Sequence, residues 1–454
     1  MPRPERIAII GAGPTGLGAA WRLLELGREE LTIFEASGAV GGLSSSVVDG
    51  RGFTWDMGGH VEFSHYPYYD RVLDELLAPH AWLRHERVAA VRVQGRFVPY
   101  PFQYNIHRLP AAARRRCLKG LEEAAKRRTR PEDFARWILA SFGKGIADLF
   151  MTPYNRKVWA WPLEELSYGW VGDRVAVTDL ARLRRTLRTG QDDADWGPNR
   201  FFRFPARGGT GAIWRAAADR IGPGRIRLRH RLAAVDPRSR TLRFSNGRTA
   251  RFDALLNTSP LDLFARCVAG LPESALRAAR RLRANSTHVV GIGLSGRPPE
   301  ALADKCWMYF PESAHPFYRL TVFSRYSPDN VPAPGRQWSL MAEVNESPFQ
   351  PARSARIAAD AVRSLRREGL LPSGCRVLSL WHRRLLRGYP LPTLDRDEAL
   401  GALQRELERL GLQSRGRFGG WRYEVGNQDH SFMQGVEWAD RLLRGRREKV
   451  YRAP

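Results

Sequence analysis

The sequence predicts a mixed α/β protein in which a nucleotide-binding fold is combined with a helical segment and an antiparallel sheet. Three observations carry this prediction. The chain begins with a strand, a glycine-rich turn, a helix and a second strand within residues 7–35. Apolar residues then recur at helical spacing through most of 110–190, and short alternating runs fill 288–345. These periodicities distinguish helices from half-buried strands.

The first element is a dinucleotide-binding motif. The apolar run Ile7–Ile10 predicts a buried strand, and the turn that follows it contains Gly11, Gly13 and Gly16. A helical pattern and a second apolar run lead to Glu35, which lies 35 − 16 = 19 residues past the third glycine. Such glycines let the backbone approach a pyrophosphate at a helix N-terminus, and an acid about 20 residues further on binds a ribose hydroxyl.

A second pair of glycines indicates which dinucleotide is bound. Gly41 and Gly42 follow Glu35 within a few residues, in the text GAVGGLSSS. Glycines at this place let the chain pass close to a cofactor's pyrophosphate, and the pair resembles that of FAD-binding proteins such as amine oxidases, protoporphyrinogen oxidases and sugar-nucleotide mutases. The sequence therefore predicts a Rossmann-like FAD-binding domain.

The remaining elements follow in order. A hairpin is expected where 88–93 and 95–100 flank the turn Gln94-Gly95, and a buried strand is expected within 252–259. The helices predicted by apolar spacing are 66–80, 111–126, 131–143, 145–151, 179–189, 212–221, 353–368, 395–410 and 431–443. Four runs predict the antiparallel sheet: 288–294, 306–310, 318–323 and 338–344.

Composition narrows the function. The net charge is +26, but only six of the 73 basic residues are lysine, an arginine bias more typical of a GC-rich gene than of nucleic-acid binding. The densest basic cluster, 114–130, reads as the solvated face of a helix. No apolar run is long enough to span a bilayer, and the four scattered cysteines suggest neither disulfides nor a metal site. We therefore expect a cytoplasmic protein without nucleic acid, membrane span or metal.

Several segments carry residues suited to chemistry. The text DMGGHVEFSHY places His60 beside two glycines, so that the backbone can approach a planar ring. Arg174 and Arg319 stand among apolar neighbours, where a guanidinium needs an anionic partner such as a phosphate or a structural carboxylate. Aromatic and amide residues around 100–105 and 153–162 suit a nucleotide base, although core packing explains any one of them equally well.

Together these segments resemble the UDP-galactopyranose mutases, and specifically the eukaryotic-type branch. The matching text includes GAGPTGLGAA, WDMGGHVEFSHY, GRFVPYPFQYNI, MTPYNRKVWAWP, FPARGGTGAIW and YEVGNQDHSFMQGVE, in order along nearly the whole chain. The resemblance implies a discontinuous FAD-binding domain (1–105, 200–260 and 405–454), a helical nucleotide domain (106–199) and an antiparallel sheet domain with flanking helices (261–404).

The resemblance also implies an isomerase. Reduced flavin N5 would act as nucleophile at the anomeric carbon of a nucleotide-diphosphate pyranose, and the sugar would reclose as a furanose without net oxidation. UDP-galactopyranose is the first candidate substrate, while the sugar and the nucleotide stay open, with dTDP as an alternative. NADPH or NADH would reduce the flavin. The alternative function is that of an amine oxidase or desaturase-type oxidoreductase, and the oligomeric state is open.

Site residues are carried over from the family by position. The catalytic group would be His60, Arg174 and Arg319. The substrate would be held by Tyr100, Phe102, Gln103, Asn155, Trp159, Asn199, Trp307, Tyr309, Tyr389, Tyr423 and Asn427. The cofactor would be held by Gly11, Gly13, Gly16, Glu35, Gly41, Gly42, Gly59, Arg417, Gly426, Gln428 and Ser431.

The chain departs from the family at a few positions. Glu62 and Arg325 place charges where an apolar and a small polar residue are expected, which can alter flavin reactivity or the sugar pocket. Arg87 matches an arginine near the phosphate of the nicotinamide nucleotide, but Ala89 replaces the family's serine. The choice between NADPH and NADH is therefore open.

Overall fold

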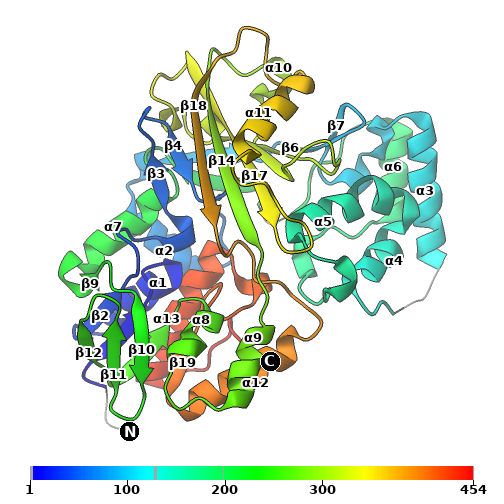
Figure 1. The fold of residues 1–454 in the computed structure, drawn as a ribbon. Helices are drawn as coiled ribbons and strands as arrows, with labels where there is room; N and C mark the ends of the chain where they lie inside the picture. The colour runs from blue at the N-terminus through cyan, green and yellow to red at the C-terminus, as the bar shows by residue number, and fades with distance from the viewer. Residues whose placement is uncertain (1–3, 127–129, 198, 453–454) are drawn as a thin grey trace.

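A five-stranded parallel sheet and a seven-stranded sheet form the two main parts of the molecule, and a helical segment lies beside the second (Figure 1). The structure is a computed structural model that describes residues 4–126, 130–197 and 199–452. Among these residues, no helix combines the length and apolar character that crossing a bilayer requires.

The parallel sheet has the strand order β19-β13-β1-β2-β9. Its strands are β1 (Ile7–Ile10), β2 (Leu31–Phe34), β9 (Ile226–Arg227), β13 (Ala254–Asn257) and β19 (Leu412–Ser414). Every residue of β1 is buried, as expected for a parallel strand covered on both faces. This confirms the predicted strand, turn, helix and strand at the start of the chain.

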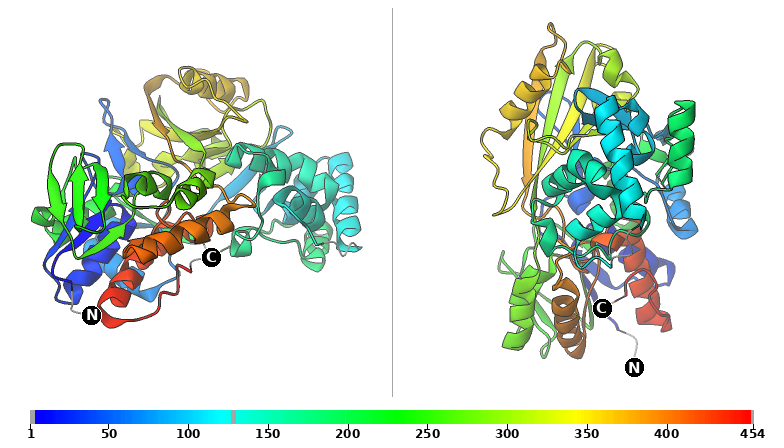
Figure 2. Two further views of the ribbon diagram at one scale, coloured as in Figure 1. Left: turned by 60° about the horizontal axis from the view of Figure 1, so that its bottom comes forward. Right: turned by 90° about the vertical axis from the view of Figure 1, so that its right-hand side faces the viewer.

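Helices and a small sheet cover the two faces of the parallel sheet. One face packs against α1 (Pro14–Glu25), α2 (Pro67–Leu76), α7 (Gly211–Ile221) and α13 (Gln428–Arg444). The other face packs against β10 (Leu232–Asp236), β11 (Thr241–Phe244), β12 (Thr249–Arg251), α8 (Leu261–Cys267), α9 (Glu273–Arg281) and α12 (Arg396–Arg409). The first and last helices, α1 and α13, lie together (Figures 1 and 2).

The second sheet has the strand order β18-β14-β17-β16-β15-β6-β7. Its strands are β6 (Ala89–Val93), β7 (Arg96–Pro99), β14 (Ser286–Ser295), β15 (Trp307–Tyr309), β16 (Arg319–Val322), β17 (Gln337–Glu346) and β18 (Val377–Leu385), with α10 (Glu300–Ala303) and α11 (Ile357–Arg367) beside it. The four predicted runs form neighbouring antiparallel strands, apart from the parallel pairing of β15 with β6.

Two details of this sheet were not expected. The hairpin β6–β7 turns at Gln94 and Gly95 as predicted, but it extends the second sheet, although the sequence-based division groups it with the first FAD-binding segment. Strand β18 was not predicted at all. Both differences have the same physical reason: contacts between segments that are distant in the sequence decide which strands pair.

A small hairpin packs closely against the second sheet. It consists of β3 (Ser46–Val48) and β4 (Thr54–Asp56). A separate two-stranded sheet is formed by β5 (Trp82–Glu86) and β8 (Phe201–Pro205). A Cβ added at Gly291 of β14 would lie 2.5 Å from the Trp55 ring, so only glycine permits this approach.

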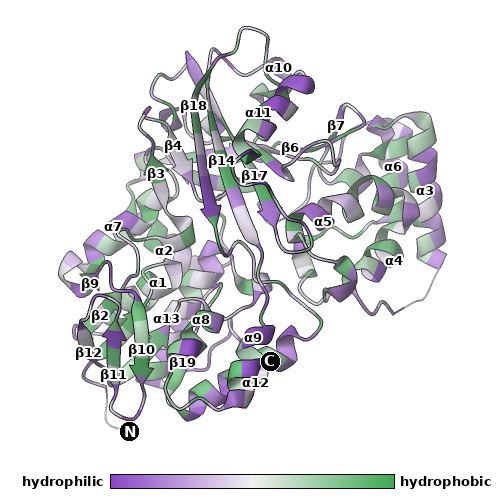
Figure 3. Cartoon of the chain, viewed as in Figure 1, coloured by the Kyte–Doolittle hydropathy of each residue, from purple (hydrophilic) through white to green (hydrophobic). Residues whose placement is uncertain are grey.

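The helical segment contains α3 (Ala111–Lys126), α4 (Phe134–Ile146), a π-helical turn (Ala147–Met151), α5 (Thr152–Trp159) and α6 (Leu180–Thr189). Hydrophilic and hydrophobic residues alternate along α3, in keeping with one buried and one solvated face (Figure 3). The basic cluster follows the solvated face as far as Lys126, while Arg127 to Thr129 lie outside the described residues.

Candidate functional site

The glycine turn and the acid of the first motif lie together at the end of β1. Gly11 has φ +103°, and a Cβ added at Gly16 would lie 2.0 Å from the carbonyl oxygen of Gly11, so both positions require glycine. The Glu35 carboxylate accepts hydrogen bonds from the backbone N–H of Ala12 at 2.9 Å and of Ser37 at 2.7 Å. The acid is therefore held over the turn.

The second glycine pair lies against the first turn. Gly41 and Gly42 both have positive φ, and a Cβ at Gly42 would lie 3.5 Å from the Cα of Gly13. The two turns thus form one backbone surface at the N-terminus of α1. Its shape and the exposed backbone N–H groups of a helix start suit the pyrophosphate of a dinucleotide.

Residues 57–66, which contain Gly59 and His60, form a loop that we call the glycine-histidine loop. A buried carboxyl anchors the chain between this loop and the surface formed by the two glycine turns. Asp56, at the end of β4, accepts hydrogen bonds from Ser46 Oγ and from Thr210 Oγ1, the latter at 2.8 Å. Burial raises the pKa of its carboxyl to about 7. The sequence offered no signal for this role, since Thr210 is 154 residues from Asp56 along the chain.

The glycine-histidine loop follows directly after β4. The Gly59 N–H donates to Glu343 Oε1 at 3.2 Å, and a Cβ at Gly59 would meet Arg319 Nη2 and Thr321 Oγ1, each at 3.1 Å. His60 Nδ1 is buried without a hydrogen-bond partner among the described residues. Burial lowers the pKa of the His60 ring to about 4, so the ring is neutral at neutral pH.

The two predicted arginines have different partners. Arg319 is partly buried and forms a bidentate ion pair with Glu343, whose Oε1 accepts from Nη2 at 2.8 Å. Arg174 donates to Asn427 Oδ1 at 3.2 Å and to the Glu424 carbonyl at 2.7 Å. Within the described residues Arg174 has no carboxylate partner.

A third guanidinium lies near these two. Arg417 donates to the carbonyls of Gly426 and Gly388, both at 3.1 Å, and it too lacks a carboxylate partner among the described residues. Its guanidinium carbon lies 4.9 Å from the centre of the Tyr389 ring and 5.8 Å from that of Tyr423. Burial lowers the pKa of this group, and the nearby charge of Arg174 lowers it further.

Tyrosines connect the three arginines. Arg174 lies 5.1 Å from the Tyr423 ring centre, and Tyr389 and Tyr423 lie 5.7 Å apart. The hydroxyl of Tyr389 lies 3.2 Å from that of Tyr318. Tyr318 was not among the predicted residues, because it reads as an ordinary strand residue until the sheet brings it to Tyr389.

The other predicted substrate residues form a second aromatic group. Tyr100 lies 5.4 Å from Tyr309, which accepts a hydrogen bond from Trp307 Nε1 at 2.8 Å. Tyr154, also not predicted, packs 5.1 Å from Tyr309. Trp159 packs against Tyr423 of the first group at 5.0 Å. Tyr154 joins the two groups, because its ring centre lies 6.3 Å from that of Tyr318.

The amides of the predicted nucleotide end are fixed by the backbone. Gln103 Nε2 donates to the Ala176 carbonyl at 2.5 Å, and Asn155 Nδ2 donates to the Met151 carbonyl at 2.8 Å. Phe102 is fully buried and packs on Phe150 in the core of the helical segment. For Phe102 the structure shows a core contact, and a substrate contact stays a prediction.

The loop formed by residues 190–197 lies beside Tyr100, whose ring centre is 6.0 Å from that of Trp196. Arg87 Nη1 donates to Asn199 Oδ1 at 2.6 Å, and Arg87 Nη2 donates to the carbonyls of Ala194 and Trp196. Arg87 also lies 5.4 Å from the centre of the Tyr100 ring. The residue carried over for the nicotinamide nucleotide is thus occupied by this loop.

The start of α13 completes the site. Asn427 is its N-cap residue, and the Ser431 N–H donates to the Asn427 carbonyl at 2.8 Å. Gln428 accepts a hydrogen bond from Trp214 Nε1 at 2.8 Å and donates to Glu62. The hydrogen bond between Gln428 and Glu62 therefore connects α13 to the glycine-histidine loop.

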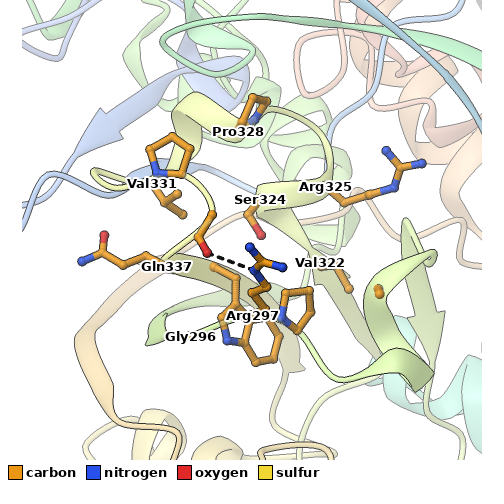
Figure 4. A pocket seen from close by; sticks show the side chains of 13 residues that line it. Gly296, Arg297, Val322, Ser324, Arg325, Pro328, Val331 and Gln337 are labelled. Carbon is orange, nitrogen blue, oxygen red and sulfur yellow. Dashed lines mark hydrogen bonds between the residues drawn. The ribbon is translucent and has the colours of Figure 1, made fainter.

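Arg325 does not lie with these residues. It borders a separate cavity of about 340 Å³ at the edge of the second sheet, together with Arg297, Ser324 and Gln337 (Figure 4). None of the predicted site residues lines this cavity.

Comparisons with known proteins place the chain in a family. Residues 14–370 match the model of the flavin containing amine oxidoreductases. A crystal structure of reduced UDP-galactopyranose mutase superposes on this chain with a TM-score of 0.96 and has 45% sequence identity to it. The superposition covers 99% of this chain and 96% of the other chain. The chain belongs to the UDP-galactopyranose mutase family. It is therefore a flavin-dependent mutase and an isomerase, with the predicted mixed α/β fold.

Other proteins match this chain over shorter segments or with lower sequence identity. Protoporphyrinogen oxidase 2 of Arabidopsis thaliana is 40% identical over 72 residues, and a zeta-carotene desaturase of Solanum lycopersicum is 39% identical over 82 residues. Each match spans 16% of this chain and only 14% of the relative's length. A putative protoporphyrinogen oxidase from Exiguobacterium shares the fold, with a TM-score of 0.72 and 15% identity.

Proposed function

We propose that this mutase interconverts the pyranose and furanose forms of a nucleotide-diphosphate sugar, with UDP-galactose as the first candidate. The observation that carries the proposal is the group of three guanidiniums around Tyr389 and Tyr423. Arg174 and Arg417 lack carboxylate partners in the described residues, and a partly buried cation of this kind favours an anionic ligand. A sugar diphosphate supplies that charge.

The cofactor-binding residues fit FAD. The two touching glycine turns leave room for a pyrophosphate, and Glu35 is held where a ribose hydroxyl would bind. Gly59 keeps the next loop free of a side chain beside Arg319. When bound and reduced, the flavin supplies a nucleophilic nitrogen for the anomeric carbon of the sugar.

In this proposal the arginines and tyrosines stabilise the departing diphosphate. Arg174 and Arg319 neutralise its charge, and Tyr309, Tyr389 and Tyr423 donate hydrogen bonds to its oxygens. Arg319 is held in place for this by Glu343. His60, which is neutral, contributes through the position of its loop.

The nucleotide end would be held by the second aromatic group. One N–H of Gln103 and one of Asn155 are engaged with backbone carbonyls, which leaves each amide its oxygen, to accept the N–H of a uracil, and a second N–H, to donate to a uracil oxygen. Tyr100 and Trp159 supply ring faces near these amides. Asn199, shortly after the loop formed by residues 190–197, would reach the substrate.

We also propose that NADPH or NADH reduces the flavin and that the protein works in the cytoplasm. Arg87 supports the first point, since a guanidinium suits a nucleotide phosphate. Because Arg87 now bonds to the loop at 190–197 and to Asn199, the reductant would bind when this loop opens. Stopped-flow reduction with each nucleotide distinguishes NADPH from NADH.

The experiment for the main proposal uses the FAD-loaded enzyme reduced with dithionite. It is incubated with UDP-galactofuranose, with UDP-galactopyranose and with the dTDP analogues, and the products are separated by chromatography. We expect isomerisation by the reduced enzyme and none by the oxidised enzyme. Failure of every nucleotide sugar to isomerise, with the flavin bound and reduced, would overturn the proposal.

The second candidate is an oxidoreductase of the amine oxidase or desaturase type, favoured by the family model and by the short desaturase matches. Such an enzyme consumes substrate electrons, so an amine or a polyene alone bleaches the oxidised flavin under anaerobic conditions. The mutase proposal predicts no bleaching by either compound.

A further inference from the structure

The one charged position of the glycine-histidine loop that the proposed function leaves without a role is Glu62. Its side chain is 2% exposed, and its backbone pairs with Arg203 of β8 through two hydrogen bonds of 3.0 and 2.8 Å. A buried carboxyl is costly unless it is hydrogen-bonded, so its partners indicate why it is tolerated.

Two groups donate hydrogen bonds to the Glu62 carboxyl, and no cation among the described residues forms an ion pair with it. The Tyr69 hydroxyl donates to Oε2 at 2.8 Å, and Gln428 Nε2 donates to Oε1. The neighbouring guanidinium of Arg203 is directed to Asp70 and Asp74 instead. Within the part of the chain that the structure describes, the negative charge of an ionised Glu62 is therefore not balanced by an ion pair.

The Gln428 amide has only one possible orientation here. Its Oε1 accepts from Trp214 Nε1 at 2.8 Å, and an indole N–H can only donate. The nitrogen must therefore face Glu62. The second N–H of this nitrogen has no acceptor among the described residues, and it lies at the start of α13, beside the loop that carries Gly59 and His60.

We propose that Glu62 is a positioning residue of the flavin site: it fixes the Gln428 amide so that its second N–H faces the cofactor. At alkaline pH, where its carboxyl is ionised in the oxidised enzyme, it also takes up a proton when the cofactor becomes negatively charged on reduction. The inference rests on the proposed function only in needing bound FAD. It concerns cofactor reduction, and no nucleotide sugar enters it.

The charges around Glu62 favour proton uptake. Asp429 of α13 and Asp56 of β4 disfavour its ionised form, while Arg203 of β8 favours it and Tyr69 of α2 donates to it. Burial is the largest influence, and the pKa of Glu62 is raised to about 8. A further negative charge on a nearby flavin raises it again.

The balance of the reduction is explicit. Dithionite supplies two electrons, and solvent supplies one proton to the flavin. Where Glu62 is ionised in the oxidised enzyme, solvent supplies a second proton, which forms the Glu62 carboxylic acid. Where Glu62 is already protonated, one proton per two electrons suffices.

The experiment measures the midpoint potential of the FAD-loaded enzyme from pH 6 to pH 9.5, in anaerobic dithionite titrations with indicator dyes and no sugar nucleotide. We expect the wild-type slope to change, between neutral and alkaline pH, from one proton per two electrons to two. Glu62→Gln keeps the shape and an acceptor oxygen but cannot ionise, so its slope stays at one. Glu86→Gln, at an exposed position of β5, is the matched control and follows the wild type.

Two results overturn the inference. The first is a wild-type profile without a change of slope, which needs no variant to fold. The second is an FAD-loaded Glu62→Gln enzyme with the wild-type profile. An infrared difference spectrum of the reduction at pH 9 adds a second measurement: a carboxylic acid C=O band gained by the wild type and absent in Glu62→Gln. If the midpoint potential shows the predicted change of slope but the enzyme has no isomerase activity, the mutase proposal is refuted and the inference about Glu62 is not.

Discussion

Replacing Arg174 tests the proposed diphosphate site most directly. Without substrate, its two Nη groups donate to neutral acceptors, the Asn427 amide oxygen and the Glu424 carbonyl. A hydrogen bond that involves a charged group contributes about 1.5–3 kcal/mol. The bonds of the guanidinium to neutral acceptors fall near the lower end of this range, and its bonds to ionised phosphate oxygens fall near the upper end. Moving two donors from neutral acceptors to phosphate oxygens therefore gains about 2–3 kcal/mol.

This difference sets the expected loss of activity. Because about 1.4 kcal/mol corresponds to a factor of ten in rate, Arg174→Ala should lower kcat/KM by about 30- to 150-fold. Much of the loss should fall on kcat, since additional negative charge develops on the diphosphate in the transition state, as its bond to the sugar breaks. Arg174→Lys keeps the charge but not the planar fork and should fall between the two enzymes.

The assay is isomerisation of UDP-galactofuranose by the dithionite-reduced enzyme, with thermal denaturation and FAD content measured in parallel. Arg185→Ala, which changes an exposed arginine of α6, is the matched control and should retain wild-type rates. An Arg174→Ala enzyme within threefold of the wild type in kcat/KM, with full FAD content, would refute the role of this guanidinium.

Three further predictions follow from the same geometry. Arg87→Ala removes the hydrogen bonds to Ala194, Trp196 and Asn199. KM should then rise more than kcat falls, and the backbone amides of the loop at 190–197 should exchange hydrogen faster. Unchanged exchange rates would contradict this prediction. Since burial lowers the pKa of His60 from 6.5 to about 4, the unfolded state binds more protons between these values. The stability contribution of His60 is therefore complete above pH 6.5 and is lost as the pH falls toward 4. The melting temperature should decline over this pH range, and His60→Gln should make the decline smaller. Gly59→Ala adds a Cβ that meets two side chains at 3.1 Å and should cost about 1–3 kcal/mol of stability, measured by denaturant unfolding, whereas Gly50→Ala, with open space around it, should cost less.

The local elements could be predicted because their signals are local. The apolar run Ile7–Ile10, the glycine turn and Glu35 specify one strand, one turn and one acid within 35 residues, and the structure confirms each of them. The turn at Gln94 and Gly95 was found in the same way. The order of family motifs then located most candidate site residues along the chain.

The partners of those residues could not be predicted. The sequence showed that Arg319 needs an anion but not that Glu343, on a neighbouring strand, is its partner. It placed Arg417 near Gly426 but gave no sign that its charge is left without a carboxylate. It flagged Glu62 as a departure without indicating Tyr69 or Gln428.

By itself, then, the sequence determined the nucleotide-binding start, the types of most elements and the family. Only the tertiary structure decided that β6 and β7 extend the second sheet, that Tyr318 joins Tyr389, and which guanidiniums carry an uncompensated charge. The physical reason is that backbone turns and hydrophobic periodicity act over a few residues, whereas ion pairs and buried hydrogen bonds depend on which distant segments the packed core brings into contact.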